Sequence, residues 1–386
     1  MINLEKSVKK FARNAIRPLI PQSLYARFVW LWHLLIDRGS DLDWPSLLSD
    51  HRIDPVLKNM LLAANEIHGQ EGWASNYWAA LNFKQIKQLI EEGFDNFKQT
   101  TALHYFTSVS KNNYQLDFFK KHLSQGVRDR AAKQAKAVPH HSKFSTEESF
   151  QYNEMTYLLW EYLLQEFSTN PYVSSLEEPE FGNPPIVPIG AQSVTADLGN
   201  SLLDFFSMNE VIEGLKKNAT VLELGAGYGR TSYVLMKARP DLRYVIVDIP
   251  PALYTSQRYL SLCFPERRIF TFRRFDSFAS IEKEFLAFDL VFLMPGQLKL
   301  LPNKIADLFI AIDCLHEMRR SQIQDYFEEM DRLAKNTYFS CRKTATVPYE
   351  KIILSEKDYA PLPSWQQVYW RERKVHSDYF EALFTI

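Results

Sequence analysis

The chain of 386 residues is 46% hydrophobic, which is enough for two domains with ordinary cores. Lys and Arg together number 45 and Asp and Glu 46, so the formal net charge of -1 provides no global field that would favour nucleic acid. Three scattered cysteines are too few for a disulfide framework or a metal knuckle, and they favour a reducing, cytoplasmic setting.

The N-terminal stretch has the pattern of an amphipathic helix with one basic face. Its apolar side carries Leu4, Val8, Phe11 and Ile16. We expect this helix to pack on its own domain, and the alternative is peripheral attachment to an anionic membrane. No cleavage site of a signal peptide is evident. The apolar stretch 28–36 is too short to cross a bilayer.

Further helices are predicted before residue 170, and none carries a catalytic motif. Their patterns cover 55–68, 83–97, 113–123 and 146–167. His140 and His141 follow a proline in a polar segment without matching acids or cysteines, so we expect solvated histidines and no metal site. Residues 171–190 are rich in proline and glycine and mark a linker. The predicted domains are therefore a helical one over 1–185 and an α/β one over 186–386.

A glycine-rich turn between a strand and a helix dominates the second half. The apolar run 221–224 predicts a buried strand, and 234–238 continues with helical spacing after the turn at 225–229. This is the first half of a nucleotide-binding unit, with the ligand over the helix N-terminus. A second apolar run, 244–247, ends at Asp248, where an acid can bind both hydroxyls of a ribose.

The spacing of the glycines distinguishes two kinds of ligand. A dinucleotide loop has the pattern GxGxxG, whereas this loop has GxGxG. Glu223 lies two residues before the first glycine, where a carboxylate would repel a pyrophosphate and suit a ligand with an ammonium group. The loop therefore favours a single nucleoside with a charged amino group over a nicotinamide dinucleotide.

Two segments, ELGAGYGR and VIVDIP, resemble the class I S-adenosylmethionine-dependent methyltransferases. Two more, LGNSLLDFF and DLFIAIDCLHEM, resemble the sugar O-methyltransferases of that superfamily. The resemblance implies a Rossmann-like α/β fold, S-adenosylmethionine as the cofactor, and a stretch from Ser193 to Ser201 that closes the cofactor site. Ser193 and Asp197 suit a helix N-cap equally well. The cofactor-binding residues implied are Glu223, Gly225, Ala226, Gly227, Tyr228, Gly229, Asp248, Ile249, Gln297, Leu298 and Asp313.

Later apolar runs predict the remaining strands. We assign the third strand to 289–294 and the adenine contact to Gln297, and the competing candidate is Asp276 in the segment before it. Residues 307–312 form the predicted fourth strand, whose tip faces the reactive end of the cofactor. The runs 365–370 and 379–386 suit an antiparallel pair that closes the sheet.

His316, just beyond the fourth strand, is the candidate general base. An imidazole with an ordinary pKa near 6.5 can take the proton of an acceptor hydroxyl at neutral pH. Glu317 or Asp313 could orient the ring or bind a sugar hydroxyl. These two acids alone are an insufficient metal site, so we expect metal-independent chemistry.

The sequence therefore predicts an O-methyltransferase that acts on a sugar hydroxyl in glycan or polysaccharide assembly. Two alternatives stay open: methylation of a phenolic or polyketide acceptor, and a non-catalytic binding module that keeps the cofactor fold. A nicotinamide oxidoreductase is the weakest alternative. The identity of the sugar, its linkage and the oligomeric state are not predicted.

Overall fold

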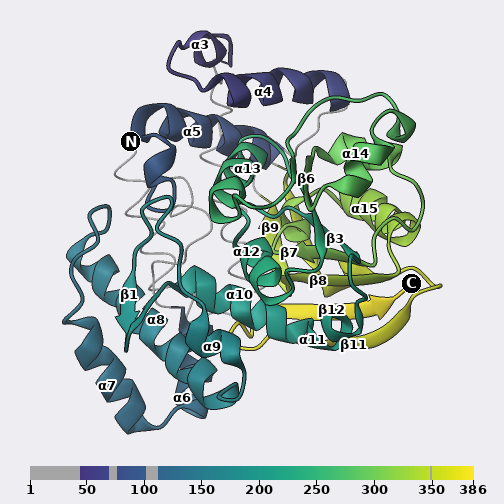
Figure 1. Cartoon of the computed structure of the whole chain (residues 1–386). Coiled ribbons are helices and arrows are strands. Elements are labelled where there is room, and N and C mark those ends of the chain that lie inside the picture. Colours follow the sequence, from purple (N-terminus) through teal and green to yellow (C-terminus); the bar gives the residue numbers. More distant parts are fainter. Residues whose placement is uncertain (1–43, 69–75, 101–111, 348–349) are drawn as a thin grey trace.

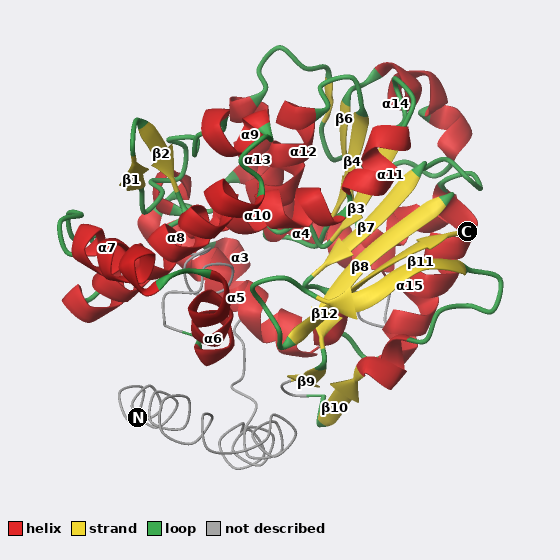
Figure 2. Cartoon of the chain, turned by 90° about the horizontal axis from the view of Figure 1, so that it is seen from below, coloured by secondary structure: helices red, strands yellow, loops and turns green. Residues whose placement is uncertain are grey.

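The computed structural model describes residues 44–68, 76–100, 112–347 and 350–386. Its centre is an eight-stranded sheet with the strand order β11-β12-β8-β7-β3-β4-β6-β5. The strands are β3 (Thr220–Leu224), β4 (Arg243–Val247), β5 (Ile269–Phe270), β6 (Leu290–Leu293), β7 (Leu308–Ile312), β8 (Asn336–Arg342), β11 (Gln366–Glu372) and β12 (Tyr379–Thr385). The first six are parallel, and β12 and β11 add an antiparallel pair at one edge (Figure 2).

Helices cover both faces of this sheet (Figure 1). Those that follow its strands or immediately precede it are α10 (Ala196–Ser207), α11 (Asn209–Gly214), α12 (Arg230–Ala238), α13 (Ala252–Cys263), α14 (Glu282–Ala287) and α15 (Arg320–Leu333). Two small hairpins lie outside the main sheet, formed by β1 (Val187–Ile189) with β2 (Gln192–Val194) and by β9 (Thr344–Val347) with β10 (Ile352–Ser355).

The described N-terminal part consists of helices. They are α3 (Trp44–Ser49), α4 (Pro55–His68), α5 (Asn76–Glu92), α6 (Asn113–His122), α7 (Gln125–Ala135), α8 (Thr146–Glu166) and the short α9 (Pro171–Ser175). The longest, α8, begins with a capping box in which the Ser145 hydroxyl and the Glu148 side chain satisfy each other's backbone N–H groups. No helix among these described residues, or in the rest of the described chain, is long and apolar enough to cross a membrane.

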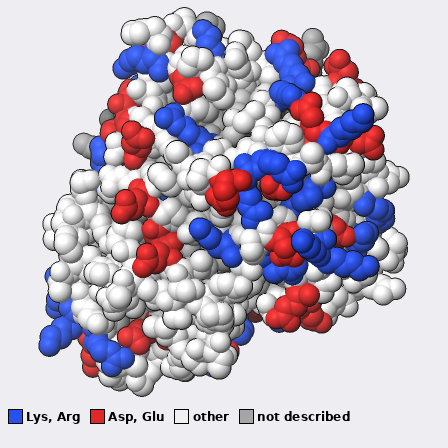
Figure 3. Space-filling view, viewed as in Figure 1, with Lys and Arg blue, Asp and Glu red and all other residues white. Residues whose placement is uncertain are grey.

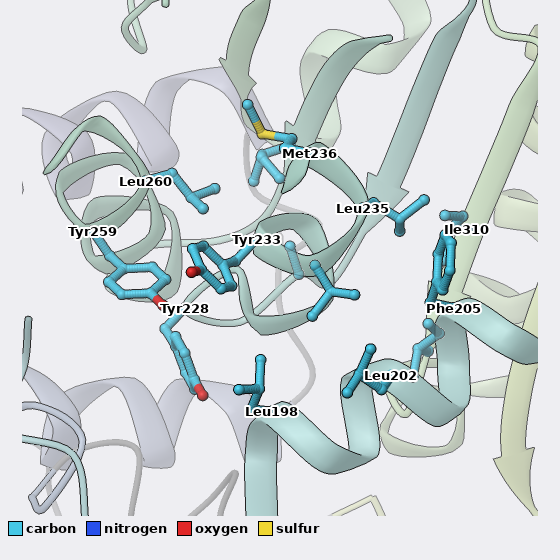
Figure 4. Packing of buried hydrophobic residues seen from close by; sticks show 14 of the residues in the cluster. Leu198, Leu202, Phe205, Tyr228, Tyr233, Leu235, Met236, Tyr259, Leu260 and Ile310 are labelled. Atoms are coloured by element: carbon cyan, nitrogen blue, oxygen red, sulfur yellow. The ribbon is translucent and has the colours of Figure 1, made fainter. Parts of the chain in front are cut away.

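Alternate residues of the buried strands point to opposite faces of the sheet. Val221 and Ile310 belong to the cluster under α10, α12 and α13, whereas Leu222 and Phe309 belong to the cluster under α14 and α15. Because both faces are covered, the strands read as continuous apolar runs. Figure 4 shows the first cluster from close by, with Leu198, Leu202 and Phe205 of α10 facing the side chains of α12.

A buried ion pair lies where the N-terminal helices meet the sheet domain. Lys98, two residues after the turn η4 (Phe94–Asn96), forms an ion pair with Glu178, and both side chains are almost fully buried. The Lys98 ammonium also lies 4.4 Å from the centroid of the Tyr259 ring and 5.4 Å from that of Tyr228. We call Lys98, Glu178, Tyr228 and Tyr259 the Lys98 junction. The hydrophobic cluster under α10 is continuous across it.

The predicted elements agree with the structure in type more often than in boundary. The helices predicted at 55–68 and 146–167 match α4 and α8, but the one predicted at 83–97 begins at Asn76 and ends at Glu92. The four predicted strands and the closing antiparallel pair are present, and α7 and the two small hairpins were not predicted. The N-terminal amphipathic pattern lies outside the described residues. The boundary at residue 185 stays a prediction.

The prediction of a solvated His141 is wrong. Its ring is buried, and its Nε2 lies 2.8 Å from the Asn153 Oδ1 on α8. Burial is the largest cause of the lowered pKa of His141. The prediction failed because the sequence around His141 is polar, whereas the burying contact comes from Asn153 on helix α8.

Candidate functional site

The glycine loop joins β3 to α12 and lies against the tip of β7. Gly225, Gly227 and Gly229 all have positive φ angles, of 71°, 62° and 90°. A Cβ on Gly225 would come within 2.5 Å of the Cys314 Cβ, and one on Gly229 within 2.8 Å of Leu260. At these two positions the loop needs glycine both for its backbone conformation and for close packing on neighbouring elements.

Asp248 ends the second strand, as predicted, and its carboxylate holds the loop. One oxygen accepts a hydrogen bond from the Gly227 N–H and the other from the Ile249 N–H, each at 2.7 Å. The side chain is buried, and this desolvation raises its pKa to about 7, although the two backbone bonds act in the opposite direction. Each oxygen keeps a lone pair for a further donor such as a hydroxyl. These residues therefore fit the ribose of a nucleoside.

Glu223 lies beneath the loop, where two hydroxyl groups bind it. Its Oε2 accepts hydrogen bonds of 2.6 Å from both Ser232 of α12 and Tyr244 of β4. Desolvation raises the pKa of this carboxyl group. The predicted contact with an ammonium group stays a prediction. These two hydrogen bonds connect β3, β4 and α12 through Glu223.

The segment ahead of α10 reaches the loop through Asp197. The Tyr228 hydroxyl donates a 2.8 Å hydrogen bond to an Asp197 oxygen. Neither Ser193 nor Asp197 is the N-cap of α10, because the Thr195 hydroxyl accepts from the Leu198 N–H instead. The prediction that Ser193 or Asp197 caps the helix is therefore wrong, because the capping residue is Thr195. Asp197, in the first turn of the helix, instead binds the tyrosine of the glycine loop.

Four charged side chains form a closed set at the carboxyl ends of the central strands. Arg230 donates to Asp204 at 3.0 Å and lies 3.4 Å from Asp313. Arg373, in the turn between β11 and β12, donates to Asp313 at 2.8 Å and also pairs with Asp204. We call these four residues the charge ring. Asp204 and Arg373 are its buried members, and Asp313, whose side chain is 35% exposed, is its most open member.

His316 lies next to the charge ring, in the short turn η7 (Leu315–Glu317) after β7. Its ring packs edge-to-face on Tyr379 at 5.8 Å, and its Nε2 is 4.0 Å from a Glu317 oxygen. Nδ1 is buried and has no hydrogen-bond partner among the described residues. Burial, with smaller contributions from Arg342 and Arg373, lowers its pKa well below the usual value. This shift favours the neutral imidazole.

The two alternatives for the adenine contact, Gln297 and Asp276, lie on segments that a hydrogen bond connects. Gln297 is buried, accepts from the Met294 N–H and donates to the Arg273 carbonyl, both at 2.9 Å. It thereby ties the turn after β6 to the segment that carries the exposed Asp276. Residues 290–293 form the third strand beside β4, as predicted. Leu298 is buried in the same turn. The adenine contact with Gln297 and the alternative contact with Asp276 both stay predictions.

Several residues of this region were missed by the sequence analysis. They come from four separate segments: Asp204, Arg230, Arg342, Arg373, His376 and Tyr379. A further member of the region, Asn200, lies in the stretch 193–201 that was predicted to close the cofactor site. With Asp313 and His316 they form what we call the strand-tip cluster. The His376 Nε2 lies 2.9 Å from the Asn200 oxygen, so α10 also holds the turn between β11 and β12. A signal existed only for Arg230, which directly follows the glycine loop.

No group of three or more metal-ligating side chains gathers anywhere in the described ranges. Acidic and basic side chains are interspersed over the face shown in Figure 3, as the near-zero net charge suggests. The site is thus defined by the glycine loop, Asp248 and the strand-tip cluster, all at one edge of the sheet.

No protein-family model matches the sequence, and neither does any curated protein. Among solved structures, a SAM-dependent methyltransferase from Aquifex aeolicus is 18% identical, with a TM-score of 0.31, over 48% of this chain and 91% of that one. Magnesium protoporphyrin IX methyltransferase from Synechocystis PCC 6803, solved with bound SAM, is 12% identical, with a TM-score of 0.32, over 50% of this chain and 85% of that one. Likenesses this distant carry no argument about activity, which must come from the site itself.

Proposed function

We propose that this protein transfers a methyl group from S-adenosylmethionine to a hydroxyl group of a sugar. The observation that carries the proposal is that a GxGxG loop, the loop-binding Asp248 and His316 meet at the carboxyl edge of one parallel sheet. Ligands of open α/β sheets bind at this edge. The sugar as acceptor is supported by the resemblance of the segments around Asn200 and His316 to sugar O-methyltransferases.

The cofactor would be held from its two ends. Asp248 has lone pairs for the ribose hydroxyls, and the two less buried members of the charge ring, Arg230 and Asp313, would offer one charge of each sign to an amino-acid end. S-adenosylmethionine supplies the methyl group as an electrophile when it is bound. The chain's own contribution is to orient both reactants, which lowers the entropic part of the barrier.

His316 would accept the proton of the acceptor hydroxyl. With a proton on Nε2, which faces Glu317, the lone pair of Nδ1 is the basic site. The low pKa keeps this nitrogen unprotonated at neutral pH, so the base is ready without a prior proton loss. The proton moves from the hydroxyl oxygen to Nδ1.

Mass spectrometry after incubation with S-adenosylmethionine and a carbohydrate panel tests the proposal. We expect one sugar to gain a single methyl group while S-adenosylhomocysteine forms in equal amount. A panel of phenols should gain none. Methylation of phenols alone would replace the sugar by the phenolic acceptor. Cofactor binding without transfer to any alcohol would favour the non-catalytic module.

The abundance of rings gives little support to a phenolic acceptor. Many aromatic side chains are packed in the interior, among them Phe97, Trp160 and Tyr259. Phe97 packs against Tyr228 and Tyr259 in the Lys98 junction, with centroids 5.4 and 5.8 Å apart. The aromatic content of 14% thus has structural explanations that need no aromatic cleft.

A further inference from the structure

Arg342 differs from the other arginines of the strand-tip cluster because no acid among the described residues forms an ion pair with it. Arg230 pairs with Asp204 and Asp313, and Arg373 pairs with the same two acids. The Arg342 side chain is partly buried, yet within the described part of the chain it forms no hydrogen bond and has no carboxylate within 4.0 Å. A desolvated guanidinium without a partner is costly unless a ligand supplies the missing anion.

The position of Arg342 is fixed by the sheet. It is the last residue of β8 and lies directly opposite Tyr379, the first residue of β12, in the antiparallel register. Its guanidinium carbon lies 5.0 Å from the centroid of the Tyr379 ring. The cross-strand pairing and the ring together hold the cation at the carboxyl edge, without a salt bridge.

Two more polar groups without hydrogen bonds to described residues lie near this cation. One is the buried His316 Nδ1. The other is the hydroxyl of Tyr379, a half-buried side chain whose ring lies against Arg342. The ring of Tyr379 touches both neighbours, since it packs on His316 as well as under Arg342. The positive charge of Arg342 contributes to the low pKa of His316, after burial. A cation, a hydroxyl and a candidate base thus lie side by side.

The nearby acids do not neutralise Arg342 directly. Asp313 already binds two arginines of the charge ring. Glu317 and Asp378 are near enough for their charges to act on Arg342, but neither forms an ion pair with it. The region is therefore not a closed network like the charge ring, and the guanidinium keeps its donors for a ligand.

We propose that Arg342 and the Tyr379 hydroxyl bind an anionic group of the acceptor, a carboxylate or a phosphate, on the same molecule whose hydroxyl His316 deprotonates. This inference rests on the proposed function and narrows its substrate class to acidic sugars. The guanidinium fork matches the two oxygens of a carboxylate or phosphate, and a hydroxyl beside it adds a third donor. A neutral sugar would leave the cation unpaired.

Calorimetric titration in the presence of S-adenosylhomocysteine tests the inference without requiring methyl transfer. The three probes are D-glucose, D-glucuronate and D-glucose 6-phosphate. We expect the wild-type chain to bind at least one of the two anionic sugars about ten- to a hundredfold more tightly than glucose, the range for charge-assisted hydrogen bonds. Which anion is preferred distinguishes a carboxylate site from a phosphate site.

The variant Arg342→Gln should abolish this preference, and Arg342→Lys should keep part of it because the charge remains without the fork. Lys343→Gln is the matched control, since it removes the adjacent positive charge, which pairs with Glu372, and should keep the full preference. Thermal unfolding checks that each variant is folded, and if Arg342→Gln is not, Arg342→Lys and the salt dependence of wild-type binding decide in its place.

Equal binding of glucose and both anionic sugars by the wild-type chain would overturn the inference, and so would no binding of any of the three. A preference that survives in Arg342→Gln would also overturn it. If methyl transfer to a neutral sugar is observed without anion preference, the inference alone fails. If the preference is present and depends on Arg342, but neither anionic sugar is methylated, the proposed function is contradicted while the anion site stands.

Discussion

Two groups of buried charge adjoin the glycine loop, and they differ in how far they satisfy each other. In the Lys98 junction, Lys98 forms an ion pair with Glu178, and the rings of Tyr228 and Tyr259 lie against its ammonium group. In the strand-tip cluster the charge ring is closed, but beside it the His316 Nδ1 and the Arg342 guanidinium form no hydrogen bond with any described residue. A completed ion pair holds parts of a fold together, whereas polar groups without partners at the edge of a sheet are prepared for a ligand.

The largest effect is expected on turnover, from His316→Ala. Loss of a general base costs roughly 10²–10⁴-fold in rate. Cofactor affinity should hardly change, because the glycine loop and Asp248 carry it. Steady-state kinetics with S-adenosylmethionine measures both. His122→Ala is the control, because that exposed histidine of α6 contacts Phe118 and Tyr162 and belongs to neither the glycine loop nor the strand-tip cluster.

The pH profile sharpens the same prediction. Because the pKa of His316 is lowered, the activity should persist below pH 6.5 and fall only when the ring is protonated at a lower pH. That acidic limb should vanish in His316→Ala. A mutant with near-normal turnover would transfer the role to Asp313 or Glu317, and one that loses stability and cofactor affinity together would make His316 structural.

Substitutions in the Lys98 junction should lower the free energy of unfolding. Lys98→Met leaves Glu178 buried without its cation and should lower the free energy of unfolding by roughly 3–5 kcal/mol. The double variant Lys98→Met with Glu178→Gln should recover much of the loss. Denaturant unfolding measures both. Lys143→Met, which breaks an exposed pair with Glu92, should cost under about 1 kcal/mol, and an equal cost for both lysines would contradict the comparison.

Asp248→Ala should weaken cofactor binding by roughly 1–3 kcal/mol, because ribose hydroxyls lose their acceptor. Calorimetry measures the affinity. Asp289→Ala is the matched control, since Asp289 lies at the opposite end of the sheet and binds Arg268. Unchanged affinity in a folded Asp248 variant would remove this residue from the site.

The smallest effect concerns the charge of Asp248. Its pKa is raised in the folded chain from 3.8 to about 7, so its contribution to stability is present below pH 4 and is lost as pH rises towards 7. Asp248→Asn should therefore flatten the decline in melting temperature over this range. Hydroxyl donors favour the carboxylate, so cofactor affinity should rise with pH up to about 7 in the wild-type chain. Parallel pH profiles of the two chains would contradict this.

Local patterns were enough to predict the strands and the glycine loop, and they placed the candidate site at the carboxyl edge of the sheet. The run that ends at Asp248 is contiguous, and its register with β3 follows from parallel pairing. The partners of His316 could not be predicted, because Tyr379 lies 63 positions further along the chain and meets it only through the antiparallel return of β12. The role of Glu223 was predicted from its position alone, and its burial by Ser232 and Tyr244 depends on how α12 packs.

Calorimetric titration of the purified chain with S-adenosylmethionine and, separately, with NAD tests the central claim most directly. We predict saturable binding of one S-adenosylmethionine per chain, weakened in Asp248→Ala, and no measurable binding of NAD. Binding of NAD with no binding of S-adenosylmethionine, or binding of neither, would contradict the assignment of the glycine loop and Asp248 to this cofactor.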